Sequence, residues 1–278
     1  TDWTDVADLN YDAPGMREAM IADMDWWVKN TDIDGFRCDV AGFVPTDFWN
    51  TAITTLRATN GPLFMLAEWE DPALIEAGFN AVYGWEFHHI MNEIARGHKN
   101  VSAIAEYAAK GDTLWPSETM KMYFNTNHDE NSWNGTVEER MGDLGNAMYV
   151  LAAMMQRSFP LIYSGQEAGL NHRFPFFTKD TVGLDWSTPH GQADFFSQML
   201  ALKHKHQALF NGELGYDMSL DTDTATNSIM IVRGEEGEED QAAAIFEFGE
   251  VSSPFDVPEN MDLVIDVTGA QVWVSKLD

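Results

Sequence analysis

Short apolar runs alternate with helix-length segments over most of the chain, and this alternation limits its fold more strongly than any other feature. We predict strands in the runs "DIDGFRCDV", "PLFMLAE", "GFNAVYGWEF", "KMYFNTN" and "FPLIYS". The segments between them carry apolar residues at spacings of three and four, which is typical of helices. Apolar strands that alternate with helices indicate a parallel sheet covered by helices. The sequence therefore predicts an α/β fold up to about Phe210.

The pattern changes after Phe210. The apolar runs "NSIMIVRG", "QAAAIFEF", "MDLVIDV" and "AQVWVSK" are separated by Gly, Pro and acidic residues, with no helix-length segment between them. Such a pattern predicts a small antiparallel β-domain. We place the boundary so that residues 1–211 form the first domain and residues 212–278 form the second.

The chain is strongly acidic: 16 Lys and Arg against 45 Asp and Glu give a net charge of −29 at pH 7. A surface of this sign repels nucleic acids and anionic membranes, so we expect neither as a partner. The composition is typical either of an ordinary soluble acidic protein or of one adapted to salt, where ions screen the repulsion. Cys38 is the only cysteine, which excludes an internal disulfide.

Two charged residues, Arg37 and Asp39, lie two positions apart in the first predicted strand. Side chains at this spacing point to the same side of a strand. Burying both is costly unless they pair or take part in chemistry. Because Arg cannot lose its proton in a protein, Arg37 would keep Asp39 ionised, as a nucleophile must be. The alternative is a purely structural ion pair.

Carboxylates end three of the predicted strands: Asp39, Glu68 in "FMLAEW" and Asp129 in "FNTNHDE". Parallel α/β folds build their sites from residues at the carboxyl ends of several strands. The apolar run before Glu68 would favour its protonated form and suit it to general-acid catalysis better than Glu70. An ionised acid beside a protonated one is the pair that hydrolyses glycosides. Asp129, with its neighbour His128, would bind sugar hydroxyls in the transition state.

Five motifs together resemble glycoside hydrolase family 13, the α-amylase family: "VADLN", "GFRCD", "LAEW", "TNHDE" and "FPLIYSGQEAGL". The resemblance implies a (β/α)8 TIM barrel followed by a small all-β domain. It also implies an α-amylase-type hydrolase that acts on an α-glucan polysaccharide or oligosaccharide and retains the anomeric configuration. Asp39 would be the nucleophile, Glu68 the acid/base and Asp129 the transition-state stabiliser. Arg37 and His128 would support them.

The barrel is expected to be partial. A full barrel takes about 250 residues, whereas residues 1–211 carry only strands that match the fourth to eighth of the family. The family's earliest motif, Asp-x-x-x-Asn-His, is absent. We therefore expect the C-terminal part of a longer enzyme, whose missing N-terminal barrel strands, or self-association, complete the fold. The parent enzyme would be secreted or periplasmic.

The remaining predictions concern metal and substrate contacts. Asp8 of "VADLN" matches a calcium-binding Asp of the family, so Ca²⁺ is a candidate cofactor, and no organic cofactor is expected. The Lys-His pair that often follows the nucleophile is replaced by "DVAGFV". Trp133, Trp69 and Phe43 follow strand ends and are either sugar-stacking platforms or packing residues.

Several functions stay open at this point. The three acids do not separate an α-amylase from an α-glucosidase or a glucanotransferase. The chain could also be an inactive fragment or a non-catalytic glucan-binding relative.

Overall fold

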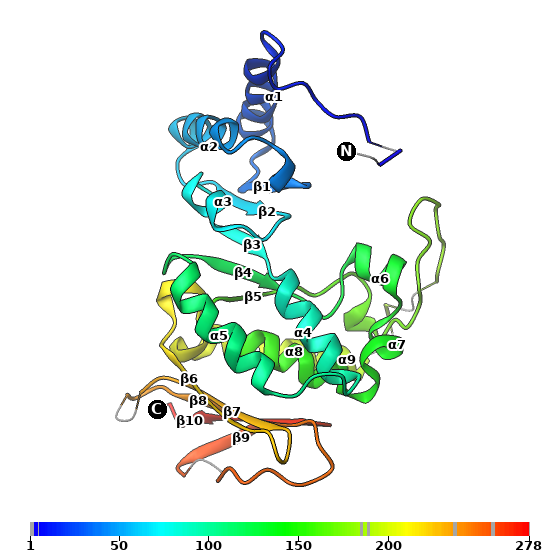
Figure 1. The fold of residues 1–278 in the computed structure, drawn as a ribbon, viewed down its shortest axis with the longest axis vertical. Helices are drawn as coiled ribbons and strands as arrows, with labels where there is room; N and C mark the ends of the chain where they lie inside the picture. The colour runs from blue at the N-terminus through cyan, green and yellow to red at the C-terminus, as the bar shows by residue number, and fades with distance from the viewer. Residues whose placement is uncertain are drawn as a thin grey trace. The chain divides into compact units, whose positions relative to one another are not determined.

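The computed structural model describes residues 3–4, 6–183, 186–187, 190–235, 238–256 and 259–277. The chain divides into two compact units, Thr1–Tyr83 and Gly84–Asp278, and each is described by itself (Figure 1).

The first unit alternates helices with parallel strands, as predicted. Its strands pair in the order β1-β2-β3, and Gly35, Phe36, Arg37 and Cys38 of β1 stand opposite Phe64, Met65, Leu66 and Ala67 of β2. Gly35 is required there, because a Cβ atom at this position would lie 1.7 Å from the carbonyl oxygen of Phe64. The elements are α1 (Met16–Thr31), β1 (Gly35–Cys38), the 3-10 turn η1 (Ala41–Phe43), α2 (Thr46–Asn60), β2 (Phe64–Ala67), α3 (Pro72–Glu76) and β3 (Ala81–Tyr83).

The second unit begins with helices around one pair of parallel strands, β4 (Met120–Tyr123) and β5 (Ser158–Pro160). The helices are α4 (Trp85–Ala95), α5 (Ser102–Leu114), α6 (His128–Asn134), α7 (Val137–Met141), α8 (Gly145–Met154) and α9 (Gly191–Lys205). Short 3-10 turns connect them: η2 (Gly142–Leu144), η3 (Gln166–Ala168), η4 (Gln207–Leu209) and η5 (Gly212–Leu214).

The unit ends in an antiparallel sheet with the strand order β6-β7-β8-β10-β9. Its strands are β6 (Met218–Asp223), β7 (Ser228–Arg233), β8 (Ala242–Glu247), β9 (Met261–Val267) and β10 (Ala270–Ser275). The predicted β-domain is therefore present, with β6 as an additional strand. The sequence pattern missed β6 because "MSLDTD" carries too few apolar residues. The predicted boundary between residues 211 and 212 stays a prediction.

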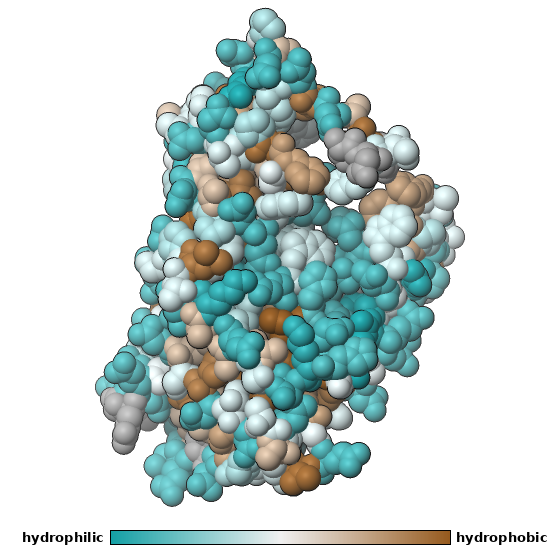
Figure 2. All heavy atoms as spheres, viewed as in Figure 1, coloured by the Kyte–Doolittle hydropathy of each residue, from teal (hydrophilic) through white to brown (hydrophobic). Residues whose placement is uncertain are grey.

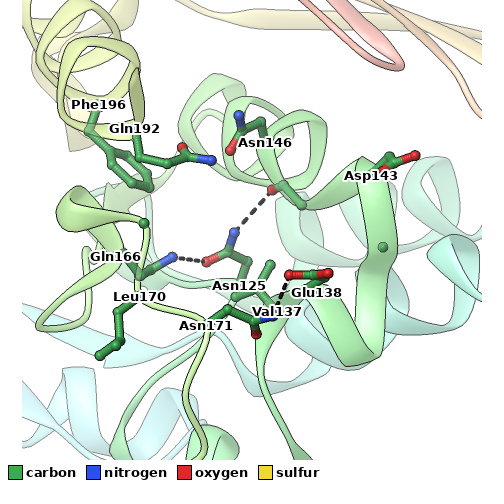
Figure 3. A pocket seen from close by; sticks show the side chains of 13 residues that line it. Asn125, Val137, Glu138, Asp143, Asn146, Gln166, Leu170, Asn171, Gln192 and Phe196 are labelled. Atoms are coloured by element: carbon green, nitrogen blue, oxygen red, sulfur yellow. Dashed lines mark hydrogen bonds between the residues drawn. The ribbon is translucent and has the colours of Figure 1, made fainter. Parts of the chain in front are cut away.

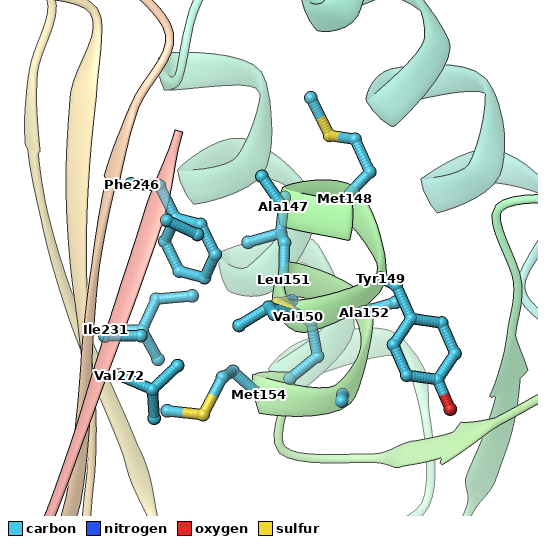
Figure 4. Close-up of a cluster of buried hydrophobic side chains, with 14 of the residues drawn as sticks. Ala147, Met148, Tyr149, Val150, Leu151, Ala152, Met154, Ile231, Phe246 and Val272 are labelled. Atoms are coloured by element: carbon cyan, nitrogen blue, oxygen red, sulfur yellow. The ribbon is translucent and has the colours of Figure 1, made fainter. Parts of the chain in front are cut away.

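Helix α8 forms the centre of the second unit's core. Nine of its ten residues are buried, the exception being Asn146, and a helix that is apolar on almost every side is typical of a core position. Figure 4 shows its side chains facing Ile231, Phe246 and Val272 of the antiparallel sheet. The helix also contacts β5, so it joins the parallel strands of this unit to its β-sheet. On the face shown in Figure 2, hydrophilic residues cover most of the second unit, as the high charge predicts.

Several predicted elements end earlier than the apolar runs suggested. The run "GFNAVYGWEF" is a strand only over Ala81–Tyr83, since α4 begins at Trp85. The strand predicted to deliver Asp129 ends at Tyr123, and Asp129 lies in α6 instead. The single long helix predicted around "ERMGDLGNAMYVLAAMMQR" is split into α7 and α8 by the turn η2. Gly142 explains this break, because its φ of 54° is left-handed.

Within the part of the chain that the structure describes, no helix has both the length and the apolar character needed to cross a lipid bilayer.

A cavity variant tests the central place of α8. Leu151 is fully buried, and Leu151→Ala is expected to lower the free energy of unfolding by about 2–5 kcal/mol, because a cavity replaces lost contacts. Denaturant unfolding followed by circular dichroism measures this. Leu114→Ala, at the exposed end of α5, is the control and should change it by less than about 0.5 kcal/mol.

Lys203 of α9 is one of the cations buried in this unit. Its Nζ atom donates hydrogen bonds to the carbonyl oxygens of Leu209, at 2.7 Å, and Ala153, at 3.3 Å. Burial, together with the positive charge of Arg233, lowers the pKa of Lys203 to about 7. The unfolded chain, in which a lysine has a pKa of about 10.4, therefore binds more protons than the folded chain between pH 7 and pH 10.

This difference makes Lys203 a source of pH-dependent stability. Because the unfolded state binds the extra proton, stability rises with pH in this window, by at most about 1.4 kcal/mol per pH unit. The rise between pH 7 and pH 9 should be about 1–2 kcal/mol smaller in Lys203→Met than in the parent chain. Equal pH slopes in denaturant unfolding would contradict the assignment.

Candidate active site

Asp39 and Glu68 leave neighbouring strands at the same level of the sheet. Cys38, the last residue of β1, stands opposite Ala67, the last residue of β2. Asp39 directly follows Cys38, and Glu68 directly follows Ala67. The amide N–H of Glu68 donates to the carbonyl oxygen of Cys38 at 3.0 Å. The parallel register therefore brings the two predicted acids together.

Arg37 connects both acids. Its Nη1 atom lies 2.5 Å from Oδ1 of Asp39, and its Nη2 atom lies 2.7 Å from Oε1 of Glu68. Its Nε atom donates to the hydroxyl of Tyr83 at 3.1 Å. Burial alone would lower the pKa of Arg37, but hydrogen bonds to Tyr83 and Asp39 and the charge of Glu68 outweigh it and raise the pKa. The two charged residues of "DGFRCDV" are thus an ion pair that also includes the second acid.

The two acids differ in exposure. The side chain of Asp39 is 74% exposed, whereas that of Glu68 is 12% exposed. Asp39 is therefore open to a ligand on one side and held by Arg37 on the other. Asp39 and Glu68 thus differ in accessibility, whereas the predicted difference in their protonation stays a prediction.

Both oxygens of Glu68 are held. Arg37 contacts Oε1, and the amide N–H of Val40 donates to Oε2 at 2.8 Å. Val40 has φ 44° and ψ 44°, a left-handed conformation that is strained for a β-branched residue and is typical of functional sites. The prediction that Glu68 has apolar surroundings is therefore wrong. Arg37 and the amide N–H of Val40 are polar partners that the apolar run before Glu68 does not reveal.

Aromatic side chains lie next to these acids in the first unit. Phe43 contacts Trp69, with ring centroids 4.9 Å apart, and also contacts Trp3 at 5.9 Å. Gly42 makes this contact feasible, because a Cβ atom there would lie 2.3 Å from the Trp69 ring. Phe43 is exposed and lines a cavity of about 710 Å³ together with Asp39 and Asp8. Phe43 is thus open to a ligand, whereas Trp69 lies against η1.

Asp8 does not gather a calcium site among the residues that the structure describes. Calcium takes six to eight oxygen ligands. Over the described ranges, Asp8 is not joined by two further His, Cys, Asp or Glu side chains close enough to share a metal ion. The other residues that line its cavity are mostly apolar. These residues do not fit calcium by themselves, and the calcium site stays a prediction.

His128 and Asp129 form the first turn of α6 in the second unit. The side chain of Asn127 caps this helix by accepting the amide N–H of Glu130 at 2.8 Å. Nε2 of His128 lies 3.5 Å from Oδ2 of Asp129, and both side chains are partly exposed. The capped start of α6, and not a strand end, therefore presents the third predicted acid.

Trp133 stands on the same short helix with aromatic neighbours that the sequence analysis missed. Its ring centroid lies 5.0 Å from that of Phe176 and 6.1 Å from that of Phe177, and all three side chains are exposed. The segment "NSWNGT" is helical up to Asn134. The aromatic residues in "RFPFF", residues 173–177, are the feature of the sequence that could have indicated this cluster.

The segments after β4 and β5 are tied together next to a polar cavity of about 310 Å³ (Figure 3). Gln166 donates to Oδ1 of Asn125 at 2.9 Å, and Asn125 donates to the carbonyl of Gly145 at 3.0 Å. Gln166 also accepts the amide N–H of Tyr163 at 2.7 Å. These contacts of Gln166 are structural.

A buried polar network behind α6 was not predicted. It consists of His88 and Asn92 of α4, Glu130 of α6 and Arg140 of α7. Helical periodicity gives no signal for it, because its members lie on three separate helices.

Comparisons with known proteins agree with this architecture. The family model "Alpha amylase, catalytic domain" matches residues 1–110. A cyclomaltodextrinase from Bacillus sp is 24% identical over 218 residues, which are 73% of this chain and 38% of that protein. The α-amylase MalA from Haloarcula japonica is 21% identical over 265 residues, 94% of this chain and 38% of that protein. Residues 1–110 thus resemble the α-amylase catalytic domain, and these two relatives match most of the chain at 21–24% identity.

Solved structures show the corresponding fold. The noncanonic maltogenic α-amylase AmyB from Thermotoga neapolitana superimposes with a TM-score of 0.75 at 24% identity, covering 88% of this chain and 55% of that one. An α-amylase from Lactobacillus plantarum gives a TM-score of 0.71 at 23% identity, covering 88% and 59%. The predicted fold class, a partial barrel followed by a β-domain, is confirmed.

The chain spans about 38% of the length of these curated relatives. The match to the α-amylase catalytic domain covers residues 1–110, and the roles of the individual site residues stay predictions.

The ion-pair cluster gives a stability prediction. Arg37→Met leaves the shielded Glu68 without its cation, so the free energy of unfolding should fall by about 1.5–3 kcal/mol, the range for hydrogen bonds to charged groups. The control is Arg17→Met, which breaks the exposed 2.7 Å pair with Asp47 and should cost less than about 1 kcal/mol. Equal losses in denaturant unfolding would show that the Arg37 cluster is an ordinary surface pair.

Proposed function

We propose that the protein hydrolyses α-1,4-glucosidic bonds of starch-like α-glucans by a double displacement that retains the anomeric configuration. One observation supports this above all: a single guanidinium, that of Arg37, holds both the exposed Asp39 and the shielded Glu68. Retaining glycosidases need two carboxyl groups close enough for one to attack the sugar while the other protonates the leaving oxygen.

Asp39 is the nucleophile in this mechanism. Its exposed carboxylate attacks the anomeric carbon, and the contact with Arg37 orients it for attack. Glu68 gives its proton to the oxygen of the leaving sugar as that bond breaks. Water then enters, Glu68 takes a proton from it, and the hydroxide displaces Asp39 from the sugar.

Arg37 explains how Glu68 can serve as acid and then as base. Before attack, Asp39 carries a full negative charge and takes up much of the positive charge of Arg37. Once Asp39 is bound to the sugar as an ester, that charge is gone, and the contact at 2.7 Å leaves Arg37 to stabilise Glu68 as a carboxylate. The change of protonation state thus follows from the covalent step itself.

Asp129 and His128 supply the remaining polar contacts. Both are partly exposed at the capped start of α6, where they can hydrogen-bond sugar hydroxyls more strongly as the ring distorts. Phe43 and the Trp133 cluster present exposed rings on which sugar faces can stack. The names of the relatives, cyclomaltodextrinase and maltogenic α-amylase, support a maltodextrin-type substrate.

Reducing-sugar release from soluble starch by the purified protein tests the proposal. Asp39→Asn, Glu68→Gln and Asp129→Asn should each lower kcat by about 10³-fold or more. The matched control is Glu70→Gln, two residues from the proposed acid, which should stay within about tenfold of the parent. Proton NMR of the first product should show the α-anomer.

Two results would contradict the proposal: full activity in Asp39→Asn, or an initial β-anomer. The product pattern adds the finer distinction, because endo cleavage gives mixed oligosaccharides, exo cleavage gives glucose, and transfer gives longer or cyclic products.

A further inference from the structure

We propose that the buried network of His88, Glu130 and Arg140 positions Asp129 for catalysis. This inference rests on the proposed function, because it assigns to the network the placing of the predicted transition-state stabiliser. None of the three residues belongs to the acid cluster around Arg37, and all three lie in the second unit.

The helix that carries Asp129 cannot hold its own position. Helix α6 has only seven residues, and isolated helices shorter than about 12 residues are marginal in water. Its geometry must therefore come from its cap and its tertiary contacts. The residue directly after Asp129 is Glu130, whose side chain turns into the protein interior.

His88 of α4 contacts the buried carboxyl group of Glu130. The His88 ring is fully buried, and its Nδ1 atom lies 2.9 Å from the carbonyl oxygen of Phe124. Because a carbonyl only accepts, Nδ1 carries a hydrogen. The other ring nitrogen, Nε2, lies 2.9 Å from Oε2 of Glu130. Because a carboxylate only accepts, this contact is a hydrogen bond when either Nε2 or the carboxyl group carries a proton.

The carboxylate of Glu130 is satisfied on its other side as well. The side-chain amide of Asn134 donates to it at 3.1 Å and 3.2 Å. Burial would raise the pKa of Glu130, but the hydrogen bond from His88 and the nearby positive charges lower it. Glu130 therefore ties the first and last turns of α6 to α4.

Arg140 fixes the segments on either side of α6. It donates to the carbonyl of Asn125 at 2.7 Å before the helix and to the carbonyl of Gly135 at 3.1 Å after it. It also donates to the side chain of Asn92 on α4 at 2.8 Å. Moving α6 would break several buried hydrogen bonds to charged groups, each of which is costly to leave unmade. The position of Asp129 is consequently set by residues that do not face the substrate.

Steady-state kinetics of His88→Phe tests the proposal. An aromatic ring is retained, but the contacts of the His88 ring with Phe124, Glu130 and Asn92 are lost. The value of kcat should therefore fall about tenfold or more while KM stays within about threefold, because small misplacements of catalytic groups are costly. Rates are measured well below the melting temperature, with the folded fraction checked by circular dichroism. The matched control is Glu93→Gln, which breaks the exposed Glu93–His98 pair of 3.3 Å near the same helix and should leave kcat unchanged.

The same substitution is then made in an Asp129→Asn background. If the network acts through Asp129, His88→Phe should lower the remaining kcat less than about twofold there. A merely structural role would give an unchanged kcat at equal folded fraction, or the same fold-loss in both backgrounds, and either result would overturn the proposal. Should His88→Phe not fold, Glu130→Gln decides in its place, since its amide can still bond His88. Glu130→Gln should lower kcat at least about threefold in the parent protein and should leave kcat nearly unchanged in the Asp129→Asn background.

The proposed function fails separately from this inference. An Asp129→Asn variant with full activity would remove the role of Asp129 itself. A large loss in Asp129→Asn together with an unaffected His88→Phe would remove only the network's role.

Discussion

The contact of one guanidinium with two carboxylates is the interaction on which the first unit's site depends. Arg37 points to the side of the sheet on which Asp39 and Glu68 lie, and it is itself fixed by Tyr83. Without it, two ionised acids at adjacent strand ends would repel each other, and Glu68 would keep only its contact with the Val40 amide. Their different exposure then assigns different tasks to chemically similar groups.

Backbone geometry makes this contact possible. The close approach of β1 to β2 at Gly35 sets the register that brings Cys38 opposite Ala67. The strained conformation of Val40 directs its amide N–H at Glu68. In the second unit, side chains instead of backbone geometry fix the candidate site residues. Helix α6 is short, and we propose that His88 and Arg140 hold it and thereby position Asp129. The two units thus fix their candidate site residues by different means.

The sequence predicted the α/β alternation, the later β-domain and the three carboxylates, because each follows from local patterns of apolar residues and from family motifs. It placed Asp39 and Glu68 correctly just after strand ends. It placed Asp129 wrongly at the end of a strand, because a capped seven-residue helix leaves little periodicity to recognise. The polar partners of Glu68 and the His88–Glu130 pair join residues 28 and 42 positions apart, and such contacts leave no trace in a local pattern.

The central claim is that Asp39, held beside Glu68 by Arg37, forms a covalent bond with the sugar. The most direct measurement is mass spectrometry of the protein after reaction with a fluorinated α-glucosyl fluoride, which forms the glycosyl-enzyme readily but is hydrolysed slowly. The account predicts one added sugar, located by peptide mapping on Asp39. A label on another carboxylate, or no label while starch is still cleaved, would contradict it.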